Sequence, residues 1–493
     1  MLRSNPHVVS MVYNRIAGDS RVIKTAQSAL NAGYRATIVG VTSSRSVEKS
    51  EVEGVPVVFI PNPSGYLSKL GLWGDEHSDD LRLLLGLYNR RALPHILELE
   101  PDLIHSHDMI GLKIGVATKM ALLASGHDIP WVHDLHELVA GLEGFARSEN
   151  YKPVCLGWER EYLDAPDRLT TVSDLLAEKL ERRYGLREQP QITYNVPVAG
   201  AFSEGGPDVR TALGLAPDVP LAVFVGGGTP LRGCDVIVDA CARIEGLHLV
   251  FVSQGKYVDE MKQRAKNLGF ADRFHTHPFV ASDQVTSFIR TADFGIHGLV
   301  HYGNAEVALP NKMFEYLHAN LPMVLSDVAS MKSFMETHRV GATFEAGNVE
   351  SCESAIRDVL ANRVELRSRI APELKSAFSW EQQEKKIQKI YAELLEGDRT
   401  SVKKERRAEA ARWEAGESTA FESIFASRLA EVTRRSQIKQ EAETRTILAR
   451  LSALDSLPAA KLKPKSKFGR FMEIAEQDGL LEAVKRGAAR AFG

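Results

Sequence analysis

Short apolar runs alternate with amphipathic segments from residue 7 to about residue 395. His7–Tyr13 and Ala36–Val41 have the length and apolar content of buried parallel strands. Between them, Arg21–Ala32 carries apolar residues at helical spacing and is followed by Gly33, a helix stop signal. This order of strand, polar loop, helix and strand predicts the start of a doubly wound α/β domain.

The same alternation resumes after a break. Gly, Pro and Ala cluster at Val198–Gly206, which is typical of a boundary between domains. Leu221–Val225 then begins a second series of predicted strands and helices. We therefore predict one α/β domain over residues 1–200 and another over residues 201–377, followed by a long helix that reaches about Leu395.

The character of the chain changes beyond Gly397. Residues 398–493 carry a net charge of about +6, include apolar positions at helical spacing, and end in the amphipathic segment Phe468–Phe492. A basic linker with four lysines precedes that segment. The tail is predicted to be helical. It can attach the protein to an anionic membrane or to a second copy, or it can be a solvated appendage.

Composition limits the class of protein. The chain has 493 residues, 44% hydrophobic and 25% charged, with a net charge of −3, which does not favour nucleic-acid binding. Its four cysteines form no CxxC pair, so neither a zinc site nor a disulfide framework is expected. We read no signal peptide and no run of roughly 20 apolar residues. The sequence thus indicates a cytoplasmic protein, with peripheral attachment to the inner face of the membrane left open.

The segment ALPNKMFEYL, residues 308–317, has the features of a nucleotide-sugar site. Pro310 suits the entry to a helix, and Asn311 is expected to cap it and leave backbone N–H groups free for a ligand. Lys312 would add a cation for phosphate, and the carboxylate of Glu315 can accept two bonds from a ribose diol. A capped surface helix with a solvated Lys–Glu pair explains the same residues equally well.

Two further stretches carry candidate ligand contacts. Gly226, Gly227 and Gly228 let the backbone approach a ligand, and Arg232 can clamp a diphosphate. His136 follows the carboxyl end of a predicted strand, where doubly wound sheets bind ligands. The alternatives are a strand-to-helix turn with a solvated arginine and a histidine that belongs to the core.

The first strand–helix loop also lies on the expected ligand side. It contains Gly18 and Asp19, and Arg21 follows at the start of the helix. The two charged residues could face a substrate. They could equally be a helix N-terminal charge and a solvated residue on the helix surface.

Taken together, these motifs resemble those of glycosyltransferase family 4, whose members have the GT-B fold and transfer a sugar with retention of its anomeric configuration. The resemblance covers about residues 7–395 and rests on five stretches in the expected order. They are NRIAGDSRVIKTAQSALNAGYRATIV, DLIHSHD, VHDLHEL with WEREYLDAPDRLTTVSDLLAEKL, VGGGTPLRGCDVIVDA, and ALPNKMFEYLHANLPMVLSD. FSWEQQEKKIQKIY also resembles the helix with which such chains return to the first domain.

The family resemblance implies an α/β GT-B fold of two Rossmann-like domains, with the helix at about 378–396 completing the first. It implies that Glu315 binds the ribose and that Arg232 and Lys312 neutralise the diphosphate. His136 would contact the donor sugar near the reacting carbon, and the Asn14–Arg21 loop would face the acceptor and phosphates. No metal or cofactor is implied beyond a nucleotide diphosphate sugar as co-substrate.

The implied reaction is transfer of a sugar from a UDP- or GDP-linked donor to a glycan or lipid-linked acceptor, with retention of configuration. Such a reaction would serve glycan, glycolipid or cell-envelope polysaccharide synthesis. Two positions depart from the family pattern, since Val307 replaces an acidic residue and Gly227 replaces an arginine. They keep open the alternative of an inactive GT-B scaffold subunit. A GT-B sugar-nucleotide epimerase, which would share the cleft but need its own acid/base carboxylates, is a second alternative that the first-domain motifs disfavour.

Overall fold

The computed structural model describes residues 5–69, 73–74, 80–143, 151–199 and 206–396. The predicted helical tail at 398–493 lies outside the described residues, as does most of the proposed boundary around residue 200. In the part of the chain that is described, no helix is both long and apolar enough to cross a membrane. The domain limits at residues 200 and 377 stay predictions.

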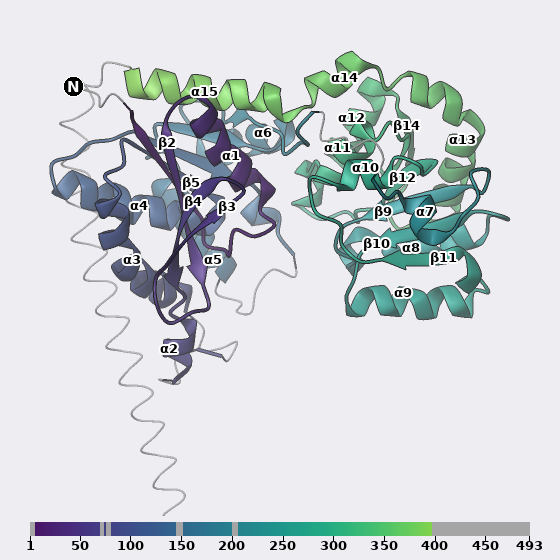
Figure 1. Ribbon diagram of the computed structural model, residues 1–493, viewed down its shortest axis with the longest axis horizontal. Helices are drawn as coiled ribbons and strands as arrows, with labels where there is room; N and C mark the ends of the chain where they lie inside the picture. The colour runs from purple at the N-terminus through teal and green to yellow at the C-terminus, as the bar shows by residue number, and fades with distance from the viewer. Residues whose placement is uncertain (1–4, 70–72, 75–79, 144–150, 200–205, 397–493) are drawn as a thin grey trace, which may run out of the picture. The chain divides into compact units, whose positions relative to one another are not determined.

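The first α/β unit is built on an eight-stranded sheet with the order β3-β4-β2-β1-β5-β6-β7-β8 (Figure 1). All neighbouring strands are parallel except β3 and β4. The strands are β1 (His7–Met11), β2 (Arg35–Thr42), β3 (Glu48–Val52), β4 (Val55–Pro61), β5 (Leu103–His107), β6 (Trp131–Leu135), β7 (Arg168–Thr171) and β8 (Gln191–Ile192). This sheet confirms the parallel α/β architecture expected for the first half of the chain.

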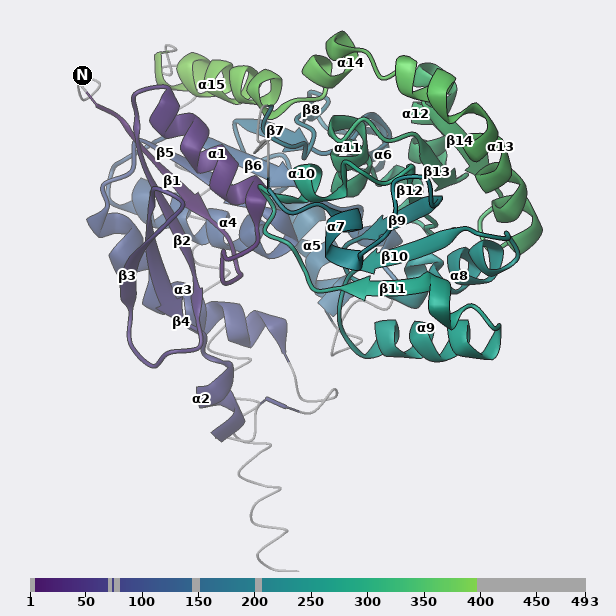
Figure 2. The ribbon, with the colours of Figure 1, turned by 45° about the vertical axis from the view of Figure 1, so that its right-hand side comes forward.

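Helices connect the strands of the first sheet. They are α1 (Ser20–Asn31), α2 (Ser64–Lys69), α3 (Leu81–Glu98), α4 (Asp108–Ala124), the short 3-10 helix η1 (Val139–Gly141), α5 (Tyr151–Tyr162) and α6 (Asp174–Tyr184). The last described helix, α15 (Trp380–Glu396), lies against α1 (Figures 1 and 2). Trp380 Nε1 donates to Ser28 Oγ over 3.2 Å, so this distant segment of the sequence contributes to the first unit.

The second unit has a six-stranded, fully parallel sheet with the order β11-β10-β9-β12-β13-β14. Its strands are β9 (Leu221–Val225), β10 (His248–Val252), β11 (Phe274–His277), β12 (Phe294–His297), β13 (Met323–Ser326) and β14 (Gly341–Phe344). Its helices are α7 (Val209–Leu213), η2 (Pro230–Arg232), α8 (Cys234–Ala242), α9 (Lys256–Asn267), η3 (Ala271–Arg273), α10 (Val285–Ile289), η4 (Ala305–Val307), α11 (Asn311–His318), α12 (Ala329–His338), α13 (Val349–Ser368) and α14 (Pro372–Ala377).

Packing of a tyrosine under a glycine places α11 against the second sheet. A Cβ added to Gly295 would lie 2.2 Å from the ring of Tyr316, so only glycine allows this approach. The Tyr316 hydroxyl donates to Ile296 O and accepts from Val225 N, both over 3.2 Å. These contacts fix α11 against the ends of β9 and β12 and thereby position the polar residues of its first turns.

Candidate functional site

Helix α11 starts one residue earlier than its predicted cap requires. Pro310 has extended backbone angles (φ −62°, ψ 137°) and is the residue that precedes the helix, whereas Asn311 is its first helical residue. No side chain caps this end, so the expectation that Asn311 is the cap is wrong. The physical reason is that proline already presets the entry angle, which leaves the first-turn N–H groups of α11 without a side-chain acceptor.

The Lys312 side chain is buried, unlike that of a solvated surface helix. Its Nζ has no hydrogen-bond partner among the described residues and lies 4.4 Å from the centroid of the Phe224 ring. Burial, and then the nearby charge of Arg232, lower the pKa of Lys312 to about 7. An ammonium group in this position lacks a counter-charge at hydrogen-bond distance in the described part of the chain, so its burial is best compensated by binding an anion.

The carboxylate of Glu315 interacts electrostatically with Lys312 and also accepts no hydrogen bond from the described part of the chain. Burial raises the pKa of Glu315 to about 7, although the charges of Lys312 and Lys24 oppose the shift. Its two oxygens are therefore free to accept hydroxyl hydrogen bonds. The structure brings Lys312 and Glu315 together as the sequence predicted.

The glycine loop is shaped around two cations. A Cβ on Gly226 would lie 3.1 Å from Lys312 Nζ, and one on Gly227 would lie 3.0 Å from Arg232 Nη1. Arg232 Nη1 also donates to Gly227 O. The family pattern often has an arginine at position 227. Here the guanidinium of Arg232 fills the space where the side chain of residue 227 would begin, which explains why this position is a glycine.

Gly228 has a different role in the same loop. A Cβ there would lie 3.2 Å from Cγ2 of Val258, on the first turn of α9. The close approach lets the loop pass beside that helix. The ligand contacts predicted for Gly227 and Gly228 stay predictions.

His297 is a polar residue of this region that the sequence analysis missed. It ends β12, is buried, and its Nδ1 has no partner within the described residues. Burial holds the pKa of His297 well below its ordinary value, and Lys312 and Arg232 add to that effect. A histidine that closes an otherwise apolar strand at its carboxyl end was the available signal.

His136 is held by a carboxylate at the carboxyl end of the first sheet. Its Nε2 lies 2.9 Å from Asp134 Oδ2. Burial alone would lower the pKa of His136, but the charge of Asp134 and its hydrogen bond outweigh burial and raise the pKa. The side chain of His136 is 19% exposed, unlike that of a fully buried core histidine, and its ring is oriented by Asp134.

Asp134 is the centre of a buried network that the sequence analysis did not identify. Arg21 binds both of its oxygens at 2.7 Å, and Thr170 Oγ1 donates to Oδ1 over 2.6 Å. Burial would raise the pKa of Asp134, but Arg21 and His136 hold it well below its usual range. An aspartate inside the apolar strand β6, two residues before His136, was the only signal in the sequence.

Arg21 does not lie where either interpretation placed it. Its side chain is 3% exposed, and it also donates to the carbonyl oxygen and hydroxyl of Thr193, each over 2.6 Å. The expectation that Arg21 faces a substrate from the loop is wrong, as is its reading as a solvated helix residue. The cause is the ionised carboxylate of Asp134, which accepts from Nε and Nη2 of the guanidinium and so holds Arg21 in the interior.

Gly18 is exposed to solvent, whereas the carboxylate of Asp19 is already hydrogen-bonded within the protein. Asp19 caps α1 by accepting from Val22 N over 3.3 Å, and it also accepts from Asn14 Nδ2 over 2.7 Å. Its carboxylate therefore matches the helix-terminus alternative. Gly18 is exposed with φ +86°, a left-handed conformation that favours glycine. An acceptor contact at this loop stays a prediction.

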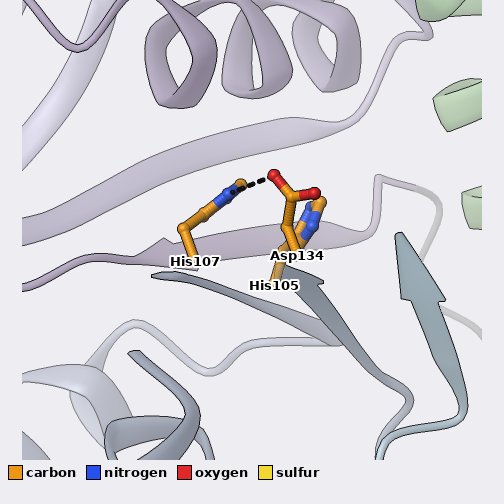
Figure 3. A group of neighbouring side chains, drawn as sticks. All are labelled: His105, His107 and Asp134. Carbon is orange, nitrogen blue, oxygen red and sulfur yellow. Dashed lines mark hydrogen bonds and ion pairs between the residues drawn. The ribbon is translucent and has the colours of Figure 1, made fainter. Parts of the chain in front are cut away.

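Among the described residues, His105, His107 and Asp134 are close enough to be considered as metal ligands (Figure 3). Asp134 Oδ2 is 3.2 Å from His107 Nδ1, and His105 Nδ1 is 2.7 Å from the Tyr391 hydroxyl of α15. Both carboxylate oxygens are already bound by Arg21, whose charge would repel an added cation. We therefore interpret the cluster as a hydrogen-bonded support for His136.

The surroundings of Val307 and Glu306 show whether the neighbouring glutamate can replace the acidic residue that the family pattern has at position 307. Val307 is 1% exposed, and its carbonyl oxygen accepts from Ser173 Oγ over 2.5 Å. Glu306 accepts from Ala329 N over 2.8 Å and lies 2.7 Å from His301 Nδ1. The neighbouring acid thus does not replace the missing one, because both of its oxygens are engaged elsewhere.

Comparison with known proteins agrees with this arrangement. The model for Glycosyltransferase Family 4 matches residues 20–196, and the model for glycosyl transferases group 1 matches residues 207–376. D-inositol 3-phosphate glycosyltransferase from Geodermatophilus obscurus is 28% identical over 301 residues, which are 57% of this chain and 64% of that protein. The match therefore spans slightly less than two thirds of that relative.

Solved structures share the fold. Sucrose-phosphate synthase from Thermosynechococcus elongatus has a TM-score of 0.63 at 15% identity and covers 80% of this chain and all of its own. Anabaena HepE in complex with UDP and glucose has a TM-score of 0.59 at 15% identity, over 79% of this chain and all of its own. One family model matches the part of the chain that forms the first sheet, and the other matches the part that forms the second. The chain therefore belongs to the family 4, group 1 glycosyltransferases, and it has the GT-B fold.

Proposed function

We propose that this protein transfers a sugar from a UDP- or GDP-linked donor to an acceptor, with retention of configuration. The observation that carries the proposal is the buried Lys312 ammonium, which has no partner among the described residues and lies beside the glycine loop and Arg232. Two cations with no carboxylate within hydrogen-bond distance form a suitable site for a diphosphate. HepE, a structural neighbour, has been solved with UDP-glucose, which supports a nucleotide sugar as the ligand class.

The donor would extend along the first turns of α11. Arg232 and Lys312 would meet the diphosphate, together with backbone N–H groups at Asn311 and in the Gly227–Gly228 loop. Glu315 would accept hydrogen bonds from the two ribose hydroxyls, since its carboxylate has no other partner in the described chain. The positive charges of Arg232 and Lys312 thus match the diphosphate of such a ligand, and the carboxylate of Glu315 matches its ribose.

In the reaction, the bond between the anomeric carbon and the leaving diphosphate oxygen breaks, and the acceptor oxygen bonds to the same face of the sugar. The acceptor proton passes to the departing diphosphate. Arg232 and Lys312 stabilise the charge that develops there, which needs no metal ion in this scheme. Because Asp134 engages Nε2 of His136, Nδ1 is the ring nitrogen left to contact the sugar.

We propose a polyhydroxyl acceptor that belongs to glycan, glycolipid or cell-envelope polysaccharide synthesis and binds beside the Asn14–Arg21 loop. Exposure of Gly18 in this loop leaves backbone available for such a contact. The reaction would take place in the cytoplasm or at the inner face of the membrane. A membrane or self-association role for residues 398–493 remains part of this proposal.

A panel of UDP-, GDP- and other nucleotide sugars tests the donor class. We expect one of them to raise the melting temperature of the full chain, since a ligand that binds the native state stabilises it. Glu315→Gln and Lys312→Met should reduce the shift, whereas Lys262→Met, an exposed lysine paired with Asp259 on α9, should not. Stabilisation that is equal in all four proteins would contradict the proposed site.

An inactive scaffold subunit is the second candidate. Val307 and the diverted Glu306 favour it, because they remove an acidic contact that family members often offer to the donor sugar. Turnover separates the two functions. Donor hydrolysis or transfer that is lost in Glu315→Gln supports the enzyme. Nucleotide binding without turnover, across the same panel and a range of acceptors, supports the scaffold.

A further inference from the structure

One histidine of the second unit, in the loop between β12 and η4, is held between two carboxylates. His301 precedes η4, and its Nδ1 lies 2.7 Å from Glu306 while its Nε2 lies 3.1 Å from Asp327. Ionised carboxylates only accept hydrogen bonds, so both ring nitrogens must donate, which requires the protonated imidazolium. The hydrogen bond that His301 donates to Glu306, and then the charges of Glu306 and Asp327, raise the pKa of His301.

Both carboxylates are themselves anchored to neighbouring backbone. Glu306 accepts from Ala329 N over 2.8 Å at the start of α12, and Asp327 accepts from Ala346 N over 2.9 Å beyond β14. His301 therefore joins its own segment, residues 298–307, to the β13–α12 junction. Glu306 and Asp327 are the charged groups that act on the imidazole in this position.

The 298–307 segment is also bonded to the turn that carries Arg232. Val300 N donates to Leu231 O over 3.1 Å. A Cβ on Gly233 would lie 2.2 Å from Gly298 O, so the segment and the turn are in close contact. From the opposite side, Ser326 Oγ donates to Leu299 O over 2.7 Å. A shift of this segment would therefore move the Arg232 turn.

We propose that His301 is a positioning residue for donor binding: as a cation between Glu306 and Asp327, it fixes the 298–307 segment and thereby the turn that carries Arg232. The inference rests on the proposed function of the Arg232 site. A histidine whose folded-state pKa is raised keeps its contribution below the ordinary pKa and loses it as pH rises through the raised value. The positioning effect is thus complete in mild acid and declines in alkali.

Three full-length variants test the role, with UDP and GDP as calorimetric probes at pH 6 and pH 9. His301→Gln cannot become a cation, whereas His301→Arg is a cation at both pH values. His95→Gln is the control, because His95 on α3 also lies near a carboxylate, 3.8 Å from Glu98. Titration of Lys312 is common to all four proteins, so differences between them at one pH report on residue 301.

At pH 6 we expect wild type, His301→Arg and His95→Gln to bind the same nucleotide equally, and His301→Gln to bind it roughly two- to fivefold more weakly, the range for a partly exposed ion pair. At pH 9 the wild type should approach His301→Gln, while His301→Arg stays tighter. Equal binding by His301→Gln and wild type at both pH values would overturn the positioning role.

A ligand-free measurement separates this inference from the donor proposal. In protein with 15N-labelled histidine, the resonances absent from His301→Gln identify residue 301, and we expect its imidazolium to titrate with a pKa above the ordinary histidine value. A pKa at or below the ordinary value would overturn the inference even if the wild type binds nucleotide. A wild type that binds neither UDP nor GDP, with the imidazolium present, would instead overturn the proposed function and the donor-positioning role that depends on it.

Discussion

Replacing Arg21 with methionine should expose how strongly the buried network around Asp134 depends on charge pairing. The side chains of Arg21 and Asp134 are 3% and 2% exposed, and two 2.7 Å bonds join them. Removing one partner of a buried ion pair leaves the other charge uncompensated, which typically costs about 3–5 kcal/mol of stability. We therefore expect Arg21→Met to lower the thermal unfolding temperature substantially at pH 7.

The stability difference between wild type and Arg21→Met should depend on pH, because Asp134 can be protonated. Arg21 and His136 hold the pKa of Asp134 well below its usual range, so in the wild type this stabilisation is present above the ordinary carboxyl pKa and is lost only as pH falls toward the lowered value. Without Arg21, burial dominates and the pKa of Asp134 rises. Between pH 7 and pH 5 the stability gap between Arg21→Met and wild type should narrow, because the variant can protonate Asp134.

Comparing Arg21→Met with an exposed-arginine variant and with a double variant tests whether the lost charge pair causes the instability. Arg182→Met removes an exposed arginine that is 3.0 Å from Glu178 and should cost about 0–1 kcal/mol. Asp134→Asn added to Arg21→Met removes the stranded charge and should recover part of the loss. If Arg21→Met is as mild as Arg182→Met in scanning calorimetry, or if the double variant is no more stable than Arg21→Met, the charge-pairing account is wrong.

Three further outcomes follow from contacts in the second sheet. Gly227→Ala should weaken nucleotide binding measured by calorimetry, because its Cβ would lie 3.0 Å from a guanidinium nitrogen, whereas Gly157→Ala, with no atom within 4 Å, should have no effect. Gly295→Ala should lower the melting temperature, with a cost of about 1–3 kcal/mol for overpacking against the buried ring of Tyr316. Because the pKa of Lys312 is lowered to about 7 and a bound phosphate favours its charged form, nucleotide affinity should fall as pH rises through about 7, and the fall should be smaller in Lys312→Met, where only the effect of His301 is left.

Much of the architecture could be predicted from the alternation of apolar and amphipathic segments. Runs such as Leu221–Val225 became fully buried parallel strands, because a sheet covered on both faces requires continuous apolar residues. The antiparallel edge strand β3 was not predicted. Its sequence EKSEV is almost entirely exposed, so it carries no apolar pattern to read. Pairing with β4 holds it, and that is a tertiary property.

The candidate site was predictable where its residues lie on one short segment. Lys312 and Glu315 share α11, so helical spacing alone brought them together. Arg21 and Asp134 are 113 residues apart, and no local pattern shows that α1 covers the end of β6. The burial of Lys312 against Phe224 also depends on the whole sheet. Local chemistry was therefore enough to propose Lys312 and Glu315 as donor contacts, whereas the network of Arg21 and Asp134 that orients His136 required the fold.

The central claim is that Lys312 and Arg232 form the diphosphate site of a nucleotide-sugar donor. Calorimetric titration of UDP and GDP into wild type and Lys312→Met at pH 6.5 tests it most directly. The account predicts binding of one nucleotide by the wild type and a loss of about tenfold or more in Lys312→Met, as expected for a charge-assisted hydrogen bond. Equal affinity of the two proteins for the same nucleotide would contradict the claim.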